Sequence, residues 1–219
     1  HISEMLDYGT TRVEVGIQTL SKKVMEIIKR GHKVEDAIKA TQLLKDSFLK
    51  CTYHMMPGLP GSSIKNDKYE LKEIFDNPDY RPDSLKIYPC LVFKGTELYE
   101  MWKQNKYKEL TTEEALDIIV ESKKYIPKYC RIMRINRDIP TFMSEAGVRK
   151  TNLRQYVDEE LKKRNIKCNC IRCREPKLNK ISWNDIKLQR LNYESSKGQE
   201  IFLSYEDIKN DILLGFARL

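Results

Sequence analysis

Three cysteines lie within six residues of one another, and their spacing is the sharpest chemical signal in the sequence. They form the pattern Cys168-x-Cys170-x2-Cys173. Thiolates at such short separations can be presented to one metal ion by a single turn, and sulfur ligands favour zinc or an iron–sulfur cluster. We expect zinc, with the fourth ligand open between Cys130, a histidine and a water molecule. An iron–sulfur cluster is the alternative metal site, and free thiols in a loop are the alternative without a metal.

A second candidate site is the loop Pro57-Gly58-Leu59-Pro60-Gly61, which follows a predicted strand. Two glycines let the backbone approach a ligand closely and two prolines stiffen it, although such sequences are most often simple turns. Alternation along the first predicted strand puts Glu14, Gly16 and Gln18 on one face, near the carboxyl end where α/β folds bind ligands. These side chains can therefore reach one pocket.

Positive charge is concentrated in one part of the chain. The 219 residues carry a formal charge of +8, whereas residues 121–190 alone carry +11. Such a segment, with aromatic residues among the cations, suits RNA, because cations displace counterions from phosphates and aromatic rings stack on bases. Arg131, Arg134 and Arg137 recur in a predicted strand and the loop after it, and in a regular strand the first two face opposite sides. A solvated basic surface is the alternative.

The elements that must position these groups alternate between strand and helix. We expect Ser21 to cap a helix that Gly31 ends, and Thr111 with Glu114 to form a capping box. The alternation predicts an α/β fold with parallel strands and about four βαβ units, half of an eight-stranded barrel. The strands are expected at 11–17, 51–56, 84–88 and 130–135, and the helices at 21–30, 34–50, 65–75, 96–104 and from 111 onwards.

The last third of the chain has a different pattern. We expect a helix over 151–164, a basic linker that contains the cysteines, and two antiparallel strands at 200–204 and 211–216, with a boundary near 165–190. A hydrophobic fraction of 40% excludes intrinsic disorder, and no apolar run is long enough to span a membrane. Six cysteines without a secretory leader favour the cytoplasm. Because the chain opens with His1 rather than methionine, we expect an interior piece of a longer protein.

Several motifs, taken together and in order, resemble the catalytic subunit of Elongator over essentially the whole chain. The resemblance implies the C-terminal portion of a TIM-like radical-SAM barrel over 1–150, a helix and Cys-rich zinc-binding linker over 151–190, and the start of a GNAT-type acetyltransferase domain over 191–219. The cysteine-rich linker is similar to that of archaeal or bacterial members. The motifs are YGTTRVEVGIQ (8–18), RGH (30–32), HMMPGLPG (54–61), RPDSLKIYP (81–89), RDIP (137–140) and FLSYED (202–207).

The resemblance implies that the wobble uridine of tRNA is modified to 5-carboxymethyluridine, with acetyl-CoA as substrate and S-adenosylmethionine and a [4Fe–4S] cluster as cofactors. The cluster motif of the family, Cys-x3-Cys-x2-Cys, does not occur in this sequence. We therefore expect the isolated stretch to lack both catalytic centres, and its catalytic residues stay unassigned. Protein lysine acetylation and an RNA-binding module with a structural zinc are the alternatives. Expected partners are tRNA, acetyl-CoA and either a second copy or other Elongator subunits, with no membrane.

Carried onto this sequence, the resemblance assigns three groups of site residues. Those near S-adenosylmethionine are Gln18, Gly58, Leu59 and Pro60. The zinc ligands are Cys168, Cys170 and Cys173, with Cys130 as the candidate fourth. Those on the tRNA-binding surface are Arg131, Arg134, Arg137, Lys167, Arg172 and Arg174.

Overall fold

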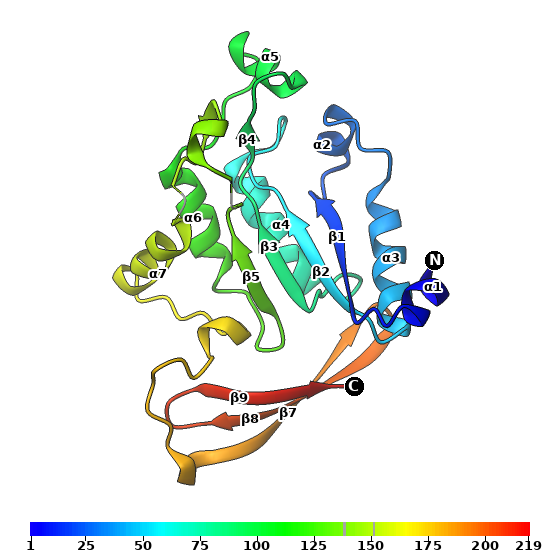
Figure 1. Cartoon of the computed structure of the whole chain (residues 1–219), viewed down its shortest axis with the longest axis vertical. Helices are drawn as coiled ribbons and strands as arrows, with labels where there is room; N and C mark the ends of the chain where they lie inside the picture. Colours follow the sequence, from blue (N-terminus) through cyan, green and yellow to red (C-terminus); the bar gives the residue numbers. More distant parts are fainter. Residues whose placement is uncertain (138, 151) are drawn as a thin grey trace.

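Four parallel strands form the central sheet of the computed structural model, which describes residues 1–137, 139–150 and 152–219. All three neighbouring pairs run parallel. Helices α3, α4 and α6 lie behind this sheet in the view of Figure 1. The predicted parallel α/β fold is therefore confirmed, with half the strands of an eight-stranded barrel. The sheet order is β1 (Arg12–Gln18), β2 (Lys50–Met55), β3 (Ser84–Ile87) and β5 (Arg131–Ile135).

Two predicted helix caps are confirmed. The Ser21 side chain accepts a hydrogen bond from the Val24 N–H. Thr111 and Glu114 form the reciprocal capping box at the start of α6. The helices are α1 (Ile2–Asp7), α2 (Lys22–Ile27), α3 (Val34–Asp46), α4 (Ile64–Asp76), α5 (Glu97–Lys103), α6 (Thr112–Ser122) and α7 (Leu153–Lys163), with short 3₁₀ turns η1 (Thr141–Met143), η2 (Ile171–Cys173) and η3 (Trp183–Asp185).

Two helices end earlier than predicted, because a non-glycine residue turns the chain with a positive φ. After α2 the left-handed residue is Lys29, with a φ of 53°, and not Gly31. After α3 it is Phe48, with a φ of 56°, which lets Lys50 begin β2. The predicted start of α7 at Thr151 lies outside the described residues, as does Asp138 of the 137–140 motif.

One face of the parallel sheet is apolar and packs against the helices. Each of the four strands contributes a fully buried side chain to this face: Ile17, Tyr53, Leu85 and Ile132. Burying each such side chain contributes about 1.5–3 kcal/mol, so this layer is the main source of stability. They share one core with side chains of α4 and α6, which include Leu71, Ile74, Ile118 and Ile119.

A β-bulge in β5 changes which side chains face the helices. Ser84 pairs with Arg131 and Lys86 pairs with Arg134, so β5 has one residue more than β3 between these pairs. Ile132 and Ile135 are consequently both buried. Arg131 and Arg134 therefore lie on the same face of the sheet, which corrects the expectation that they face opposite sides.

A three-stranded antiparallel sheet lies beyond the amino ends of the parallel strands (Figure 1). Its strands are β7 (Ile186–Ser195), β8 (Gly198–Asp207) and β9 (Ile212–Arg218). The two predicted strands, 200–204 and 211–216, are confirmed as β8 and β9. The first strand, β7, was not predicted, and the predicted end of the linker at residue 190 falls inside it. A second unpredicted pair, β4 (Leu91–Val92) with β6 (Ala146–Gly147), is also antiparallel. No helix among the described residues is long and apolar enough to cross a membrane.

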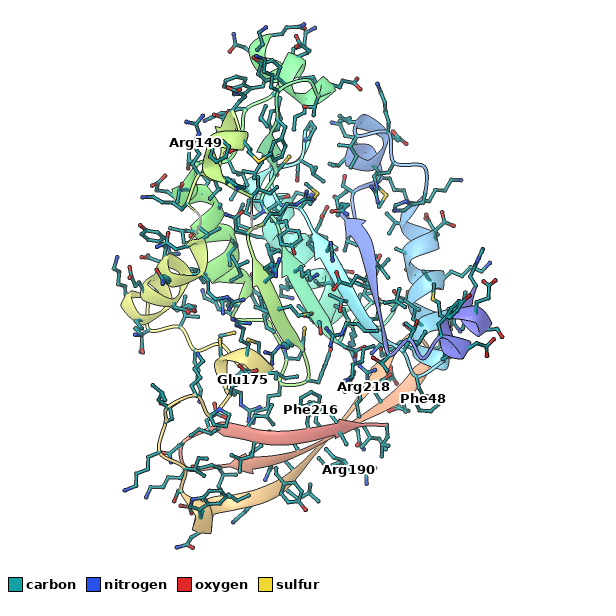
Figure 2. The ribbon with its side chains drawn as sticks, in the orientation of Figure 1. Phe48, Arg149, Glu175, Arg190, Phe216 and Arg218 are labelled. Carbon is teal, nitrogen blue, oxygen red and sulfur yellow. The ribbon has the colours of Figure 1, made fainter. Side chains whose placement is uncertain are left out.

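Buried ion pairs join this C-terminal sheet to the amino ends of the parallel strands, a contact region that we call the junction. Figure 2 shows Arg218 between the two sheets. Its guanidinium pairs with Asp83 and with Glu200, and Asp83 also accepts from Lys45 at 2.7 Å. Burial is the main reason why the pKa of Lys45 falls to about 8. These charges therefore hold the two sheets in a fixed relation.

Candidate functional site

The face of the parallel sheet opposite the helices, which we call the inner face, is polar and carries most of the predicted RNA-binding arginines. Register places its side chains in rows across neighbouring strands. In one row Glu14 is followed by Thr52, Ser84 and Arg131, and in the next His54 is followed by Lys86 and Arg134. The complete set of polar strand residues on this face is Arg12, Glu14, Lys50, Thr52, His54, Ser84, Lys86, Arg131 and Arg134.

Glu14 is the only acidic residue of this set, and it organises the cations next to it. Its carboxylate accepts from Lys86 Nζ at 2.5 Å and lies 2.7 Å from His54 Nε2. Partial burial raises the pKa of Glu14, but the hydrogen bonds from Lys86 and His54 outweigh it and leave the pKa below its ordinary value. One carboxylate among several cations leaves the inner face with a positive charge that can attract an anionic ligand.

Gln18 ends β1 at the predicted position, at the carboxyl edge of the sheet. It adopts a φ of 69°, and its carbonyl accepts from the Met56 N–H at 2.9 Å. The side-chain oxygen Oε1 is buried and finds no hydrogen-bond partner among the described residues. A buried acceptor without a partner costs about 1–3 kcal/mol, so this atom is suited to a ligand that donates a hydrogen bond.

The predicted cofactor loop, residues 57–61, is held rigidly by the protein itself. Gly58 and Gly61 both have a positive φ, and a Cβ at either position would lie within 2.6 Å of Leu110 or Ile27, respectively. The Gly58 N–H donates to Asp67 and its carbonyl accepts from the Tyr107 hydroxyl. The glycines therefore satisfy backbone geometry and packing, and both polar backbone groups of Gly58 are already used.

The rest of the loop is buried in the same way. Leu59 packs in a small cluster with Val24 and Cys90, and Pro60 is buried beside it. The Asp67 carboxylate also accepts from the Ser62 hydroxyl at 2.6 Å, and burial raises its pKa to about 6. The loop thus forms a stiff wall at the carboxyl end of β2.

Arg137 extends the inner face beyond the end of β5. Its guanidinium lies 5.3 Å from the centre of the Tyr88 ring, and the His54 ring contacts Tyr88 edge-on at 5.5 Å. Arg131 pairs with Glu175, which follows η2 and is labelled in Figure 2. The structure therefore brings Arg131, Arg134 and Arg137 to one side of the sheet together with His54.

The three other predicted RNA-binding residues lie in different surroundings. Lys167 is mostly exposed and pairs with Asp211 at 2.7 Å. Arg172 donates to the carbonyl of Met133 on the free edge of β5. Arg174 is only 3% exposed and pairs with Glu206 and Asp211, so it stabilises the junction and is not accessible to RNA.

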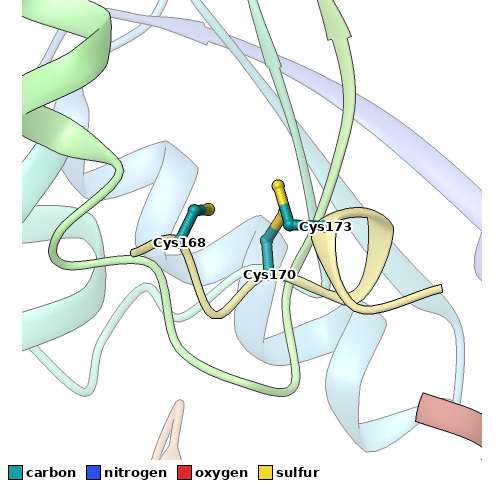
Figure 3. A group of neighbouring side chains, drawn as sticks. All are labelled: Cys168, Cys170 and Cys173. Atoms are coloured by element: carbon teal, nitrogen blue, oxygen red, sulfur yellow. The ribbon is translucent and has the colours of Figure 1, made fainter. Parts of the chain in front are cut away.

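The cysteine cluster lies at the amino end of β5, away from the loop at residues 57–61. The sulfur atoms of Cys168, Cys170 and Cys173 all lie within 4.8 Å of one another (Figure 3). Hydrogen bonds from the thiols of Cys168 and Cys173 lower the pKa of Cys170. Three converging sulfurs around the η2 turn are a donor set that fits zinc.

Cys130 is not part of this sulfur group, although its backbone touches the turn. It is fully buried at the start of β5, and its carbonyl accepts from the Ile171 N–H at 3.0 Å. Its sulfur is absent from the set of described ligand atoms that converge.

A lysine that sequence reasoning missed contacts the cluster directly. Lys123 caps the carboxyl end of α6, is completely buried, and places Nζ 3.6 Å from the Cys168 sulfur and 3.4 Å from the Cys173 sulfur. No sequence pattern distinguishes it from the exposed Lys124 beside it. Its position depends on how α6 packs against the cysteine turn.

Comparison with known proteins agrees with this architecture. A model of the Radical SAM superfamily matches residues 1–69, and one of the Radical_SAM C-terminal domain matches 82–163. The chain is 55% identical over its whole length to the tRNA uridine(34) acetyltransferase of Methanocaldococcus jannaschii and 41% identical to Elongator complex protein 3 of Schizosaccharomyces pombe. It covers 41% of each of these relatives.

A solved structure of the archaeal Methanocaldococcus infernus Elp3, with an N-terminal deletion, is similar as well. The TM-score is 0.96 at 53% identity, over 99% of this chain and 52% of that chain. The chain thus spans about half the length of the proteins that it matches, or less. The two family models together cover more than half of its residues. Residues 1–69 and 82–163 therefore match radical SAM domains, and the chain, as its motifs indicate, resembles the catalytic subunit of Elongator from end to end.

Proposed function

We propose that the protein containing this chain modifies the wobble uridine of tRNA to 5-carboxymethyluridine. The observation that carries the proposal is the positive inner face of the sheet, in a chain closely similar to a tRNA uridine(34) acetyltransferase. A cationic surface suits a polyanion such as tRNA. Its place beside the carboxyl ends of the parallel strands would let one base of that tRNA reach a radical centre. The same charge disfavours the alternative substrate, a basic protein tail, because like charges repel.

In this proposal the carboxyl edge of the sheet receives S-adenosylmethionine. Gln18 offers its unpartnered Oε1 as a hydrogen-bond acceptor, and Gly58, Leu59 and Pro60 form the stiff wall beside it. When bound, S-adenosylmethionine and a [4Fe–4S] cluster supply the radical that activates the acetyl group of acetyl-CoA. The cluster motif is not in this chain. Gln18 and the loop residues would orient the cofactor. On the inner face, His54 and Lys86 hold the ionised Glu14 between them.

The tRNA backbone is proposed to lie along the inner face. Arg131, Arg134 and Arg137 would contact phosphates, with Lys167 and Arg172 extending the surface towards the cysteine turn. Zinc bound by Cys168, Cys170 and Cys173 would brace that turn, far from the reacting base. Acetyl-CoA and an assembly with a second copy or with other Elongator subunits complete the proposed set of partners.

The test is the salt dependence of tRNA binding. Replacing Arg131, Arg134 and Arg137 together with alanine should weaken binding and reduce the slope of log Kd against log salt by about 1 for each lost phosphate contact. The matched control replaces Lys39, Lys65 and Lys124 with alanine, because these three exposed lysines lie on or beside the helices. Equal losses in both variants would indicate non-specific attraction, and unchanged affinity in the arginine variant would exclude the inner face.

A further inference from the structure

Lys123 is completely buried, and the hydrogen-bond partners of its Nζ among the described residues are sulfur atoms. Nζ lies within hydrogen-bond distance of the Cys168 and Cys173 sulfurs, and no described carboxylate contacts it. Burying an ammonium without a counter-charge costs several kcal/mol. A metal ion held by thiolates at these sulfurs would form an anionic centre that supplies this counter-charge.

The other charged residues near the cysteines do not supply a counter-charge for Lys123. Arg154 donates to the Ile132 carbonyl and Arg172 to the Met133 carbonyl, and both line a cleft of about 670 Å³ next to the cysteines. Two acids of this cleft already have cationic partners: Glu175 pairs with Arg131, and Asp211 pairs with Lys167 and Arg174. The third acid, Asp158, makes no described contact with Lys123. No described acid is therefore available to balance the buried ammonium.

The geometry of the cysteines limits the set of metal ligands. A divalent zinc with three thiolates has a net charge of −1, which the Lys123 ammonium can neutralise. Cys130 lies outside the converging sulfurs. Cys168 and Cys173, by contrast, line the cleft, and Cys173 is partly exposed. A neutral ligand can therefore reach the metal from the cleft.

We propose that Lys123 is the positioning residue of the zinc site. Its ammonium neutralises the single negative charge of zinc held by Cys168, Cys170 and Cys173, and it leaves the fourth coordination position to a neutral ligand such as water. The inference rests on the zinc assignment of the proposed function and is independent of tRNA binding.

The experiment measures zinc content and zinc affinity, by elemental analysis and chelator competition, in the wild type, Lys123→Met and the matched control Lys124→Met. Groups that hydrogen-bond to metal ligands typically change metal affinity by 10- to 100-fold, and we expect a loss of about that size for Lys123→Met and none for Lys124→Met. Wild-type protein without zinc would refute the zinc assignment itself. Wild-type protein that binds zinc no more tightly than Lys123→Met would refute only the role of Lys123.

Thermal unfolding separates this role from simple packing. Without metal, Lys123→Met should have a midpoint at or above that of the wild type, because a buried charge has been removed; with zinc its midpoint should rise less than that of the wild type. A midpoint that falls in the metal-free protein while the zinc-induced rise is unchanged would show that Lys123 only fills space.

A third variant tests the neutral fourth ligand. Cys130→Ala should keep one zinc per chain at unchanged affinity, and its cobalt-substituted form should keep the intensity of the sulfur-to-metal charge-transfer band. A weaker band together with a lower affinity would identify Cys130 as a ligand and overturn this part of the proposal.

Discussion

At the amino ends of the parallel strands charged side chains are buried in pairs, whereas on the inner face they are partly exposed, and His54 and Lys86 share one carboxylate. At the junction Arg174 pairs with Glu206, and Lys45 with Asp83, almost without solvent. On the inner face Glu14 is 37% exposed and serves both His54 and Lys86. The same residue types thus stabilise the junction but leave charge available for a ligand on the inner face.

The difference follows from what each region lies against. The amino ends are covered by a second sheet, and an ion brought there loses its water and needs a partner of opposite charge. The inner face keeps solvent, so an excess of cations costs little and attracts anions. Chemistry is therefore expected at the carboxyl ends and structural support at the amino ends, which is also where the cysteines lie.

The largest loss of stability is expected when a buried charge is removed at the junction. Arg174→Met leaves two carboxylates with only lysine partners, and we expect a loss of about 3 kcal/mol in the free energy of unfolding, measured with urea. The control Arg172→Met removes a neighbouring, more exposed arginine and should change little. Similar effects in both variants would mean that the junction does not depend on paired burial.

The pH dependence of this region has a definite sign. Burial raises the pKa of Glu206, but hydrogen bonds from Ser204 and Arg174 lower it below its ordinary value of 4.5. The stabilisation by this pair is therefore complete above that value and is lost as the pH falls through the lowered pKa.

Asp67 differs from the acids of the junction, because it is a buried acid at the carboxyl end whose described partners are neutral. Its pKa rises from 3.8 to about 6 through burial. A raised carboxyl pKa means that the contribution of Asp67 to stability is highest below pH 4 and falls as the pH rises towards 6, by about 2–3 kcal/mol. Asp67→Asn keeps one acceptor, for the Gly58 N–H, and its amide group can donate to the Ser62 hydroxyl oxygen in place of the second carboxylate oxygen. It should remove this slope from urea unfolding curves recorded between pH 4 and 7. A variant with the wild-type slope would contradict the assignment.

A smaller effect is expected from the aromatic contact between the two sheets. The Tyr129 and Tyr193 rings stack with centroids 3.8 Å apart and an interplanar angle of 5°. Tyr193→Leu keeps an apolar side chain but loses the stack, and thermal unfolding should report a loss of about 1 kcal/mol. Tyr205→Leu, on an exposed part of β8, is the control and should be close to neutral.

The smallest effect on stability is expected for Glu14→Gln. Partly exposed pairs contribute about 0–1 kcal/mol, so the free energy of unfolding should change by less than that. Removing the one acid of the inner face should strengthen tRNA binding at low salt, measured by titration. A large loss of stability would show that the inner face is built like the junction.

Much of the fold could be predicted because local signals and tertiary packing agree. The side chains of Ser21 and Thr111 cap their helices whatever surrounds them, and the β-branched run of β1 and the apolar run of β2 lie where the pattern predicts. The β7 segment shows no such agreement. Most of its residues are exposed and it pairs only with β8, so its sequence lacks the alternation that marks a half-buried strand.

The candidate site was predictable in its residue types but not in its geometry. The spacing of Cys168, Cys170 and Cys173 predicted their convergence, since the three lie on one turn. Lys123 and Arg174 were not recognisable, because their burial depends on segments distant in sequence. The orientation of Arg134 was mispredicted, since strict alternation cannot reveal an extra residue in a strand.

That extra residue in β5 has an evolutionary consequence. The bulge at Met133 acts as a one-residue insertion, and a lineage that deleted this residue would have a regular strand in which Arg131 and Arg134 still face the same side. A lineage that kept the residue but paired it regularly with β3 would instead turn Arg134 towards the helices, without changing any arginine codon. A gap at this column is therefore compatible with the shared arginine face, whereas loss of the bulge with the residue retained would abolish it.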